Sequence, residues 1–232
     1  MSTDLEKLMD ILHDLEYVPP KLIKRMLSGV LWEGDPASKA VSLTFDDGPD
    51  PDVTPKVLDT LDRYGATGSF FLTGKNVKRY PELARTIVEC GHDIGSHGMN
   101  HDVFMLRRRR DVLTDISESL RVIEEHTGCA ATLFRPPHGL FDFTTIRVVK
   151  RLKLRMVLWS LLSGDYREGE PVLVLDRVKR YMHPGAIIVF HDTVRGGGNK
   201  LPEIIDSVCA KAREDGLGLV GVHEHAGLEG IQ

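Results

Sequence analysis

The sequence predicts an α/β fold in which about seven parallel strands form a barrel or near-barrel. Short apolar runs alternate with helical patterns along most of the 232 residues, and this alternation indicates parallel strands joined by crossover helices. About seven strands in a chain of this length fit a barrel better than a long open sheet. The chain contains neither a glycine-rich dinucleotide loop nor a Walker sequence, which argues against a nucleotide-binding variant.

The strands are expected where apolar, β-prone residues cluster, over residues 41–45, 69–72, 93–95, 132–134, 156–161, 186–190 and 219–222. Helical patterns lie between these runs, over residues 53–64, 81–90, 112–126, 143–151, 171–182 and 201–214. Four of these helices are followed by a glycine, the residue that most often ends a helix, namely Gly65, Gly91, Gly128 and Gly216.

Residues 1–39 are predicted to form a helical N-terminal extension of the main domain, which spans residues 40–222. Apolar residues recur at helical spacing from Leu5 to Leu15, and Pro19-Pro20 ends this first helix. A short second helix over 21–27 carries three cations beside its apolar residues, so it could lie on a membrane surface. Packing on the domain or on a partner subunit is the expected arrangement. The polar tail, 223–232, is expected to fray.

The composition predicts a cytoplasmic globular protein. The net charge of −4 provides no basic field that would recruit nucleic acid. The three cysteines, Cys90, Cys129 and Cys209, are far apart and have no Cys-x-x-Cys spacing, as is typical of reduced thiols. Charges interrupt the first 17 residues, which therefore lack the apolar core of a signal peptide, and no run reaches transmembrane length. A homo-oligomer is compatible with the sequence.

Polar, titratable side chains follow five of the predicted strands. Because the carboxyl ends of parallel strands carry the chemistry of such barrels, we expect these residues to share one site. They are Asp46 and Asp47 after the first strand, His97 and His101 after the third, Arg135 and His138 after the fourth, Asp165 and Tyr166 after the fifth, and His191 with Asp192 after the sixth.

His97 and His101 are candidate metal ligands. Four residues apart, they can lie on one face of a helical turn and hold one ion. Such a pair alone is weak evidence, since histidines at this spacing are common on surfaces and in cores. With a carboxylate from another strand end, they would form a catalytic site that keeps positions for water. Zinc is the default ion, and nickel, cobalt or iron suit the same donors.

Asp46 and Asp47 need not share one role, since one carboxylate can bind a metal while the other transfers protons. An Asx-turn ahead of Gly48-Pro49 would explain only one of them. A buried carboxylate that is not bound to metal needs a cation, and the guanidinium of Arg135 could bind it bidentately. Pro136-Pro137 should hold the loop extended, with Arg135 directed into the site.

His191 ends an apolar run that is typical of a buried parallel strand. Asp165 could orient its ring and favour the protonated form. Asp192 could do the same, or could only cap the turn that follows.

At this point the motifs resemble those of the NodB-homology polysaccharide deacetylases, carbohydrate esterase family 4. The resemblance runs from about residue 40 to residue 222. Its motifs fall in family order: Thr44-Phe45-Asp46-Asp47-Gly48-Pro49, His97-Gly98-Met99-Asn100-His101, Arg135-Pro136-Pro137-His138-Gly139 and Val189-Phe190-His191.

The resemblance implies a distorted (β/α) barrel that uses a divalent metal ion, most often zinc, to remove the N-acetyl group of an amino sugar or polysaccharide in bacteria. It implies that Asp46 is the general base and that Arg135 positions it. It further implies that His191 is the general acid, with Asp165 as its partner. Asp47, His97 and His101 would be the metal ligands, and His138, Gly139 and Tyr166 would contact the substrate.

Several residues depart from the family pattern and leave the substrate open. Leu162 and Tyr166 replace an aspartate and a tryptophan, Val189 replaces a leucine, and His138 replaces a tyrosine. The four arginines at 107–110 could favour an anionic substrate, such as a phospho-lipid-linked or nucleotide-linked sugar or an acidic glycan, although a solvated loop is the more ordinary explanation. The alternatives are deacetylation or deformylation of a non-carbohydrate amide, and a degenerate member that binds a glycan without turnover.

Overall fold

The computed structural model describes residues 17–27, 29–167 and 171–228, and it confirms an α/β near-barrel. Within these residues the sheet has eight strands: β1 Ala40–Asp46, β2 Ser69–Leu72, β3 Asp93–Ser96, β4 Leu133–Phe134, β5 Arg155–Met156, β6 Leu161–Leu162, β7 Ile187–His191 and β8 Gly218–Leu219. The described helices are α2 Lys21–Met26, α3 Thr54–Tyr64, α4 Gly74–Arg79, α5 Pro81–Glu89, α6 Arg109–Thr127, α7 Phe143–Arg151, α8 Pro171–Tyr181, α9 Leu201–Glu214 and α10 Val222–His225, with 3₁₀ turns η1 Pro36–Ser38, η2 Pro137–Gly139 and η3 Gly198–Lys200.

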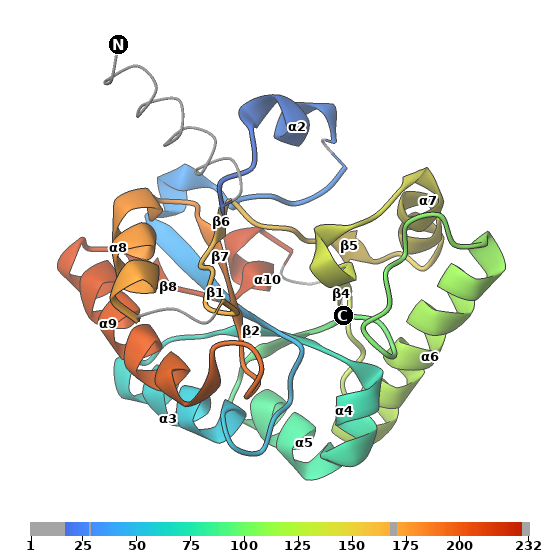
Figure 1. Cartoon of the computed structure of the whole chain (residues 1–232), viewed down its shortest axis with the longest axis horizontal. Helices are drawn as coiled ribbons and strands as arrows, with labels where there is room; N and C mark the ends of the chain where they lie inside the picture. The colour runs from blue at the N-terminus through green and yellow to red at the C-terminus, as the bar shows by residue number, and fades with distance from the viewer. Residues whose placement is uncertain (1–16, 28, 168–170, 229–232) are drawn as a thin grey trace.

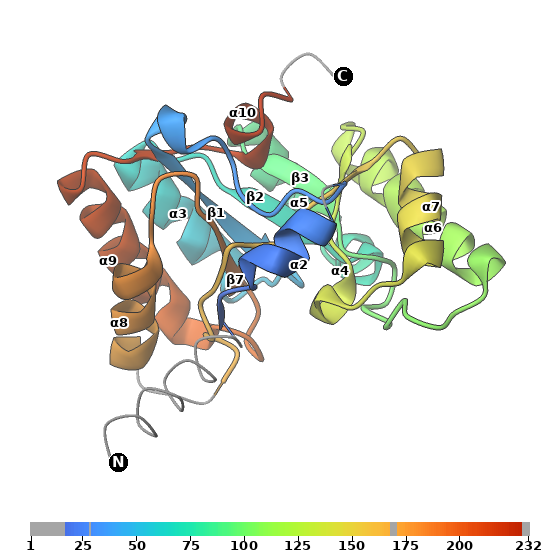
Figure 2. The same cartoon turned by 90° about the horizontal axis from the view of Figure 1, so that it is seen from above.

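The strands run in the order β5-β4-β3-β2-β1-β7-β6, and β8 pairs with the start of β1. Every strand pair is parallel, as the crossover helices require. The central strand β1 is buried along its whole length, which explains its apolar sequence. The sheet curls, and helices α3 to α9 lie outside it (Figures 1 and 2). Its two edge strands, β5 and β6, are consecutive in the chain and leave a seam between them.

The prediction of one strand over 156–161 is wrong, because the chain leaves the sheet within this run. Two carbonyl groups of this run accept hydrogen bonds from Arg135 instead of from a neighbouring strand. Nε donates to Val157 O at 3.3 Å, and Nη2 donates to Leu158 O at 2.9 Å. Val157 also forms a parallel bridge with Leu31 of the N-terminal segment. The run therefore divides into β5 at one edge and β6 at the other. The predicted strand over 219–222 is also wrong in its bounds: it overlaps β8 only at Leu219, because Val222 already begins α10.

The inside of the curled sheet is filled from both ends of the described chain. One buried apolar cluster combines residues of β2, β4 and β7 with others from the N-terminal segment and α10: Leu31, Phe71, Leu133, Val157, Ile187 and Val222. Burial of such side chains removes apolar surface from water and stabilises the fold by about 25 cal/mol for each Å² buried. The N-terminal segment and α10 are thus parts of the core.

The prediction that the tail frays from residue 223 is wrong for residues 223–228. His225 is buried, and its Nδ1 lies 2.7 Å from Ser42 Oγ of β1. His223 places Nδ1 2.9 Å from Asp93 Oδ1 and Nε2 2.7 Å from Thr132 Oγ1. These polar contacts hold α10 against the amino ends of the strands. The polar composition of the segment did not reveal them, and this is why it was wrongly predicted to fray.

The N-terminal helix predicted over residues 5–15 lies outside the described residues. The predicted second helix is present as α2, although none of its residues is buried. Val30, Leu31 and Trp32, which follow it, are buried. Among the described helices, none combines the length and apolar character that crossing a membrane requires. The cytoplasmic location and the oligomeric state stay predictions.

We predict that His225→Ala lowers the free energy of unfolding by about 2 kcal/mol, because it leaves the buried Ser42 hydroxyl without its partner. Urea denaturation should measure this loss. The control is Glu224→Ala, which removes an exposed side chain of the same helix and should change stability by less than about 0.5 kcal/mol. Equal, small effects of both substitutions would contradict a packed α10.

Candidate active site

Strand register brings the predicted site residues to one edge of the sheet. Asp46 is the neighbour of His191 across the β1–β7 pair, and His97 and Arg135 each directly follow paired residues of β3 and β4. A cavity of about 310 Å³ opens at these carboxyl ends. It is lined by Asp46, Asp47, His97, His101, His138, Gly139, Trp159, Leu162, Tyr166, Val189, His191, Arg195 and Gly196.

Asp47, His97 and His101 form a compact cluster. One ligand atom from each lies within 4.8 Å of the others. Nε2 of His101 is 3.0 Å from Asp47 Oδ1, and Nε2 of His97 is 3.6 Å from the same oxygen. The expected helical turn is absent: the two histidines lie in the loop after β3, where Gly98 and His101 have φ values of 78° and 65°. Left-handed backbone, rather than helical spacing, brings the two rings together.

The donors in this cluster fit a divalent metal ion. The ring of His97 donates from Nδ1 to the carbonyl oxygen of Arg135 at 2.7 Å, which leaves the Nε2 lone pair directed at the cluster. Burial lowers the pKa of His97 and so favours the neutral ring that a metal needs. Oδ1 of Asp47 is buried and accepts no well-aligned hydrogen bond from the described residues. A buried oxygen of this kind is costly unless an ion or a donor satisfies it.

The backbone of Asp47 is held in an uncommon conformation. Its φ is 76°, a left-handed value that aspartate tolerates better than most residues. Asn76 Nδ2 of α4 donates to its carbonyl oxygen at 2.8 Å, and Thr73 Oγ1 donates at 3.4 Å. Burial acts to raise the pKa of the Asp47 carboxyl, but contact with His101 and the charge of His97 outweigh it and lower that pKa. Asp47 is therefore ionised.

Asp46 contacts Arg135 instead of the histidine cluster. Nη1 of Arg135 donates to Asp46 Oδ1 at 2.7 Å and also to Thr44 Oγ1 at 2.8 Å. The bidentate pairing of Arg135 with Asp46 that the sequence predicts is therefore absent. The other N–H groups of Arg135 donate to Thr44 and to the carbonyl groups of Val157 and Leu158. Oδ2 of Asp46 lies 3.9 Å from His97 Nε2. This oxygen faces the cavity and can accept a proton there.

His191 is paired with Asp165. Its Nδ1 lies 2.9 Å from Asp165 Oδ1, and its backbone N–H donates to Oδ2 at 2.7 Å. Ser163 Oγ donates to the same carboxylate at 2.9 Å. Burial acts to lower the pKa of His191, but the charge and hydrogen bond of Asp165 prevail and raise it to about 9. The ring is therefore protonated at neutral pH, with Nε2 as a proton donor.

Asp192, the alternative partner of His191, faces the other way. It is fully buried, and it accepts a hydrogen bond of 2.5 Å from Thr54 Oγ1 at the start of α3. Burial raises the pKa of its carboxyl well above the usual value. Gly48 packs directly against it: a Cβ at Gly48 would lie 2.5 Å from both carboxylate oxygens. The glycine of the Asp-Asp-Gly-Pro sequence is thus required by a close approach.

Aromatic rings form the wall of the cavity. The ring of His138 meets that of His101 edge-on at 4.5 Å between centroids, and Tyr166 meets His191 in the same way at 5.3 Å. Gly139 lies under Trp159, whose ring a Cβ there would approach to 2.5 Å. The sequence interpretation missed Trp159 and Arg195. No spacing rule marks them, because loops bring them to the site.

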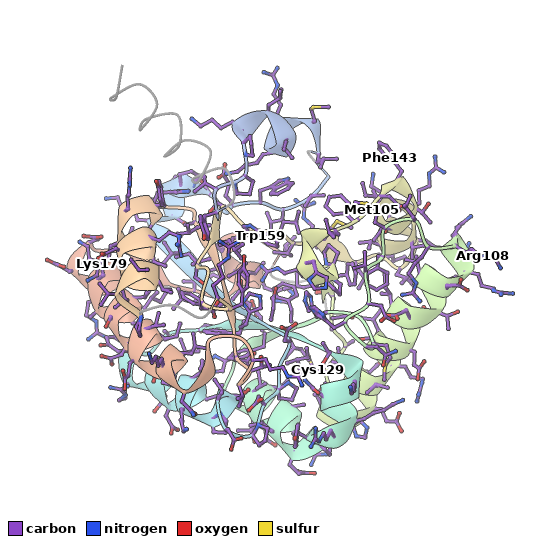
Figure 3. All side chains as sticks on the ribbon, viewed as in Figure 1. Met105, Arg108, Cys129, Phe143, Trp159 and Lys179 are labelled. Atoms are coloured by element: carbon purple, nitrogen blue, oxygen red, sulfur yellow. The ribbon has the colours of Figure 1, made fainter. Side chains whose placement is uncertain are left out.

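The arginine run at 107–110 does not line this cavity. Arg107 contacts Asp115 at 3.5 Å and Asp102 at 3.8 Å. Figure 3 shows Arg108 at the outer end of α6, whereas Trp159 lies near the centre of the molecule. The run therefore gives no support for an anionic substrate.

An α/β near-barrel with a histidine–histidine–aspartate cluster beside an arginine-paired carboxylate defines a hydrolase-like metal site. A family model described as polysaccharide deacetylase matches residues 33–157, and the chain belongs to that family.

Similar proteins include the peptidoglycan-N-acetylmuramic acid deacetylase PdaC of Bacillus subtilis, which is 30% identical over 190 residues. The match covers 82% of this chain but only 39% of PdaC, so the chain spans about two fifths of that relative. A solved peptidoglycan N-acetylglucosamine deacetylase, Bc1960, superimposes with a TM-score of 0.83 at 25% identity, covering 86% of this chain and 93% of the other. A pseudoenzyme of the same esterase family from Bacillus anthracis gives 0.78 at 26% identity, covering 84% and 67%.

We predict that Asp165→Asn lowers the pKa of the His191 ring, because it removes the charge that raises it. The stability contributed by the protonated pair is complete below the pKa of an unfolded histidine, about 6.5, and is lost as the pH rises through about 9. In the variant the protonated ring should be lost at lower pH. NMR titration of the His191 ring should show this, with Ser163→Ala as a control that keeps the charge. An unchanged titration would contradict the pairing.

Proposed function

We propose that this chain is a metal-dependent deacetylase that hydrolyses the N-acetyl group of an amino sugar in a bacterial cell-wall glycan. The observation that supports the proposal is that two adjacent carboxylates have different partners. Asp47 faces two histidines, and Asp46 faces a buried arginine. The peptidoglycan deacetylases that the chain resembles support this class of substrate.

Asp47, His97 and His101 would hold the metal ion. Two imidazoles and one carboxylate suit zinc, which we propose as the ion, although nickel, cobalt and iron accept the same donors. When bound, a divalent ion polarises an amide carbonyl and lowers the pKa of water.

The protein's own groups would move the two protons. Oδ2 of Asp46 would accept a proton from the attacking water, while Arg135 donates a hydrogen bond to Oδ1 and holds the carboxylate in position. Nε2 of His191 would donate a proton to the departing amine, because Asp165 keeps this ring protonated at neutral pH. Acetate and a free amino sugar would leave the cavity.

We predict that Asp46→Asn lowers kcat by about 10²–10⁴-fold, since it removes a proton acceptor but keeps an oxygen that Arg135 can contact. The assay is acetate release from N-acetylglucosamine oligomers, in parallel with calorimetric zinc binding. Zinc affinity should stay within about threefold of the native protein.

The matched variant is Asp47→Asn, which should weaken zinc binding at least tenfold as well as slow acetate release. A chelator should abolish the activity of the native protein. Turnover near the native rate in Asp46→Asn would overturn the assignment of the base. Zinc binding without acetate or formate release from any amide would favour a glycan-binding member without turnover.

An anionic group on the sugar is favoured by one residue of the cavity wall. Arg195 lines the catalytic cavity and forms no ion pair with an acid among the described residues. A guanidinium in this position can bind a carboxylate or phosphate bidentately. Muramic acid, the sugar in the name of PdaC, carries such a carboxylate. We therefore propose that Arg195 contacts an acidic substituent of the substrate.

We predict that Arg195→Gln raises KM for N-acetylmuramic acid oligomers about tenfold, the loss of one charge-assisted hydrogen bond. KM for the neutral N-acetylglucosamine oligomers should stay within about twofold. Lys200→Gln, an exposed cation five residues further on, is the control and should change neither value. An equal rise for both sugars would contradict recognition of the acidic group.

A further inference from the structure

The segment that leads into the barrel has a charge distribution unlike that of the whole chain. From residue 17 to residue 32 it contains no acidic residue and three cations, Lys21, Lys24 and Arg25, whereas the whole chain has a net charge of −4. Such local excess of positive charge beside apolar residues is typical of segments that meet anionic surfaces.

Helix α2 within this segment exposes its apolar side chains. Leu22 is 68% exposed, Ile23 is 43% exposed and Met26 is 74% exposed. Leu22 and Met26 are four residues apart, so they share one face of the helix. Figure 1 shows α2 above the seam between β5 and β6, apart from the other described helices. An apolar face directed to solvent on a helix without buried residues has no role in the described core.

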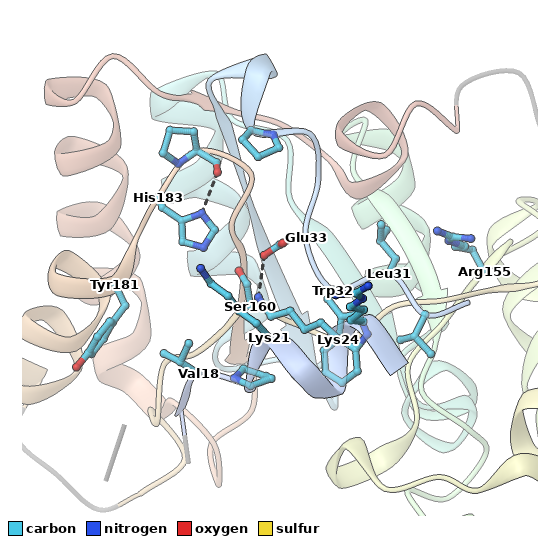
Figure 4. A pocket seen from close by; sticks show the side chains of 15 residues that line it. Val18, Lys21, Lys24, Leu31, Trp32, Glu33, Arg155, Ser160, Tyr181 and His183 are labelled. Carbon is cyan, nitrogen blue, oxygen red and sulfur yellow. Dashed lines mark hydrogen bonds and ion pairs between the residues drawn. The ribbon is translucent and has the colours of Figure 1, made fainter. Parts of the chain in front are cut away.

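The cations of α2 border a second cavity, of about 960 Å³. Its wall combines apolar residues, including Val18, Leu31 and Trp32, with Lys21, Lys24, Arg25 and Arg155 (Figure 4). Glu33 is the one acid among the lining residues, and it pairs with Lys24 at 2.7 Å.

Three of these cations lack an acidic partner. Lys21 and Arg25 form no ion pair with a described residue. Nε of Arg155 is buried and has no hydrogen-bond acceptor among the described residues. A buried guanidinium nitrogen without an acceptor is unfavourable. The four cations and one acid leave the cavity with a net charge of about +3. This charge is suited to phosphate groups.

This cavity is separate from the catalytic one and shares no lining residue with it. It lies where the N-terminal segment covers the seam: Leu31 bridges to Val157, and Glu33 bridges to Ala186 ahead of β7. Several lining residues stand at the amino ends of strands, such as Arg155 in β5 and Pro184 ahead of β7. The catalytic residues stand at the carboxyl ends.

We propose that α2 and this cavity form a docking surface for a membrane of anionic phospholipid. Leu22, Ile23 and Met26 enter the boundary between head groups and acyl chains, while Lys21 and Arg25 bind lipid phosphates beside them. The cavity behind α2 receives a lipid head group next to Arg155. An apolar face flanked by unpaired cations favours a lipid surface over a soluble phosphate, which would use the cations and leave the apolar residues in water.

The experiment is co-sedimentation of the full chain with vesicles of phosphatidylcholine containing 30% phosphatidylglycerol, compared with phosphatidylcholine alone. We expect binding to the anionic vesicles that weakens as salt is added. Lys21→Gln with Arg25→Gln should lower the partition coefficient about 25-fold, since each cation near such a surface contributes about fivefold. Leu22→Ser with Met26→Ser should lower it at least tenfold. Acetate release from a soluble substrate should be unchanged in both variants.

Matched controls change the same chemistry elsewhere. Arg109→Gln with Arg110→Gln removes two exposed cations at the start of α6, and Val172→Ser with Leu173→Ser removes two exposed apolar residues of α8. Both should leave the partition coefficient within about twofold. The proposal would be overturned by equal binding to both vesicle types, or by control variants that lower the partition coefficient as much as the test variants do. It would also be overturned if millimolar inorganic phosphate displaced the protein from the vesicles while Leu22→Ser with Met26→Ser left the partition coefficient unchanged. Absence of binding to the anionic vesicles would overturn it as well.

Discussion

The buried guanidinium of Arg135 is the interaction on which the rest of the site depends. It is fully excluded from water, and its Cζ lies over the ring of Phe71, 4.0 Å from the ring centroid. A buried charge persists only where its donors are satisfied, and Arg135 satisfies them with Asp46, Thr44 and the carbonyls of Val157 and Leu158. These contacts hold the Asp46 carboxylate in position and draw the chain away from the sheet between β5 and β6. The backbone carbonyl of Arg135 also orients His97, so one residue links the base, the metal ligands and the seam.

The two adjacent aspartates separate because a strand ends between them. Successive side chains in a strand point to opposite faces, so neighbours in sequence begin with different surroundings. Asp46, the last residue of β1, meets Arg135, and the left-handed backbone of Asp47 then turns its carboxylate towards His97 and His101. The fold alone does not secure turnover, since a pseudoenzyme superimposes well on this chain. The argument for hydrolysis therefore depends on the positions of these side chains.

Much of the fold and of the site could be predicted because periodicity and motif order are local signals. Helices α7 and α9 begin and end where their apolar periodicity predicts, and the motif residues meet because parallel strands share a carboxyl edge. Helices α4 and α10 were missed, since each is too short for periodicity to mark it. His97 and His101 have helical spacing but a left-handed loop. Trp159 and Arg195 reach the cavity through loops placed by long-range contacts, which sequence spacing does not encode.

The chain segment at the open seam contributes residues to the catalytic cavity and to the cavity beside α2. Because β5 and β6 do not pair with each other, the main chain between them has carbonyl groups available for Arg135. The same short segment places Trp159 and Leu162 in the wall of the catalytic cavity and Ser160 in the wall of the second cavity, beside α2. Leu31 of the N-terminal segment pairs with its first residue, Val157. The segment that carries α2 is therefore joined by backbone hydrogen bonds to the strand ends that hold the guanidinium in place. In a barrel closed by a β5–β6 pair, the carbonyl groups of Val157 and Leu158 would be drawn into the sheet, and Nε and Nη2 of Arg135 would lose their acceptors.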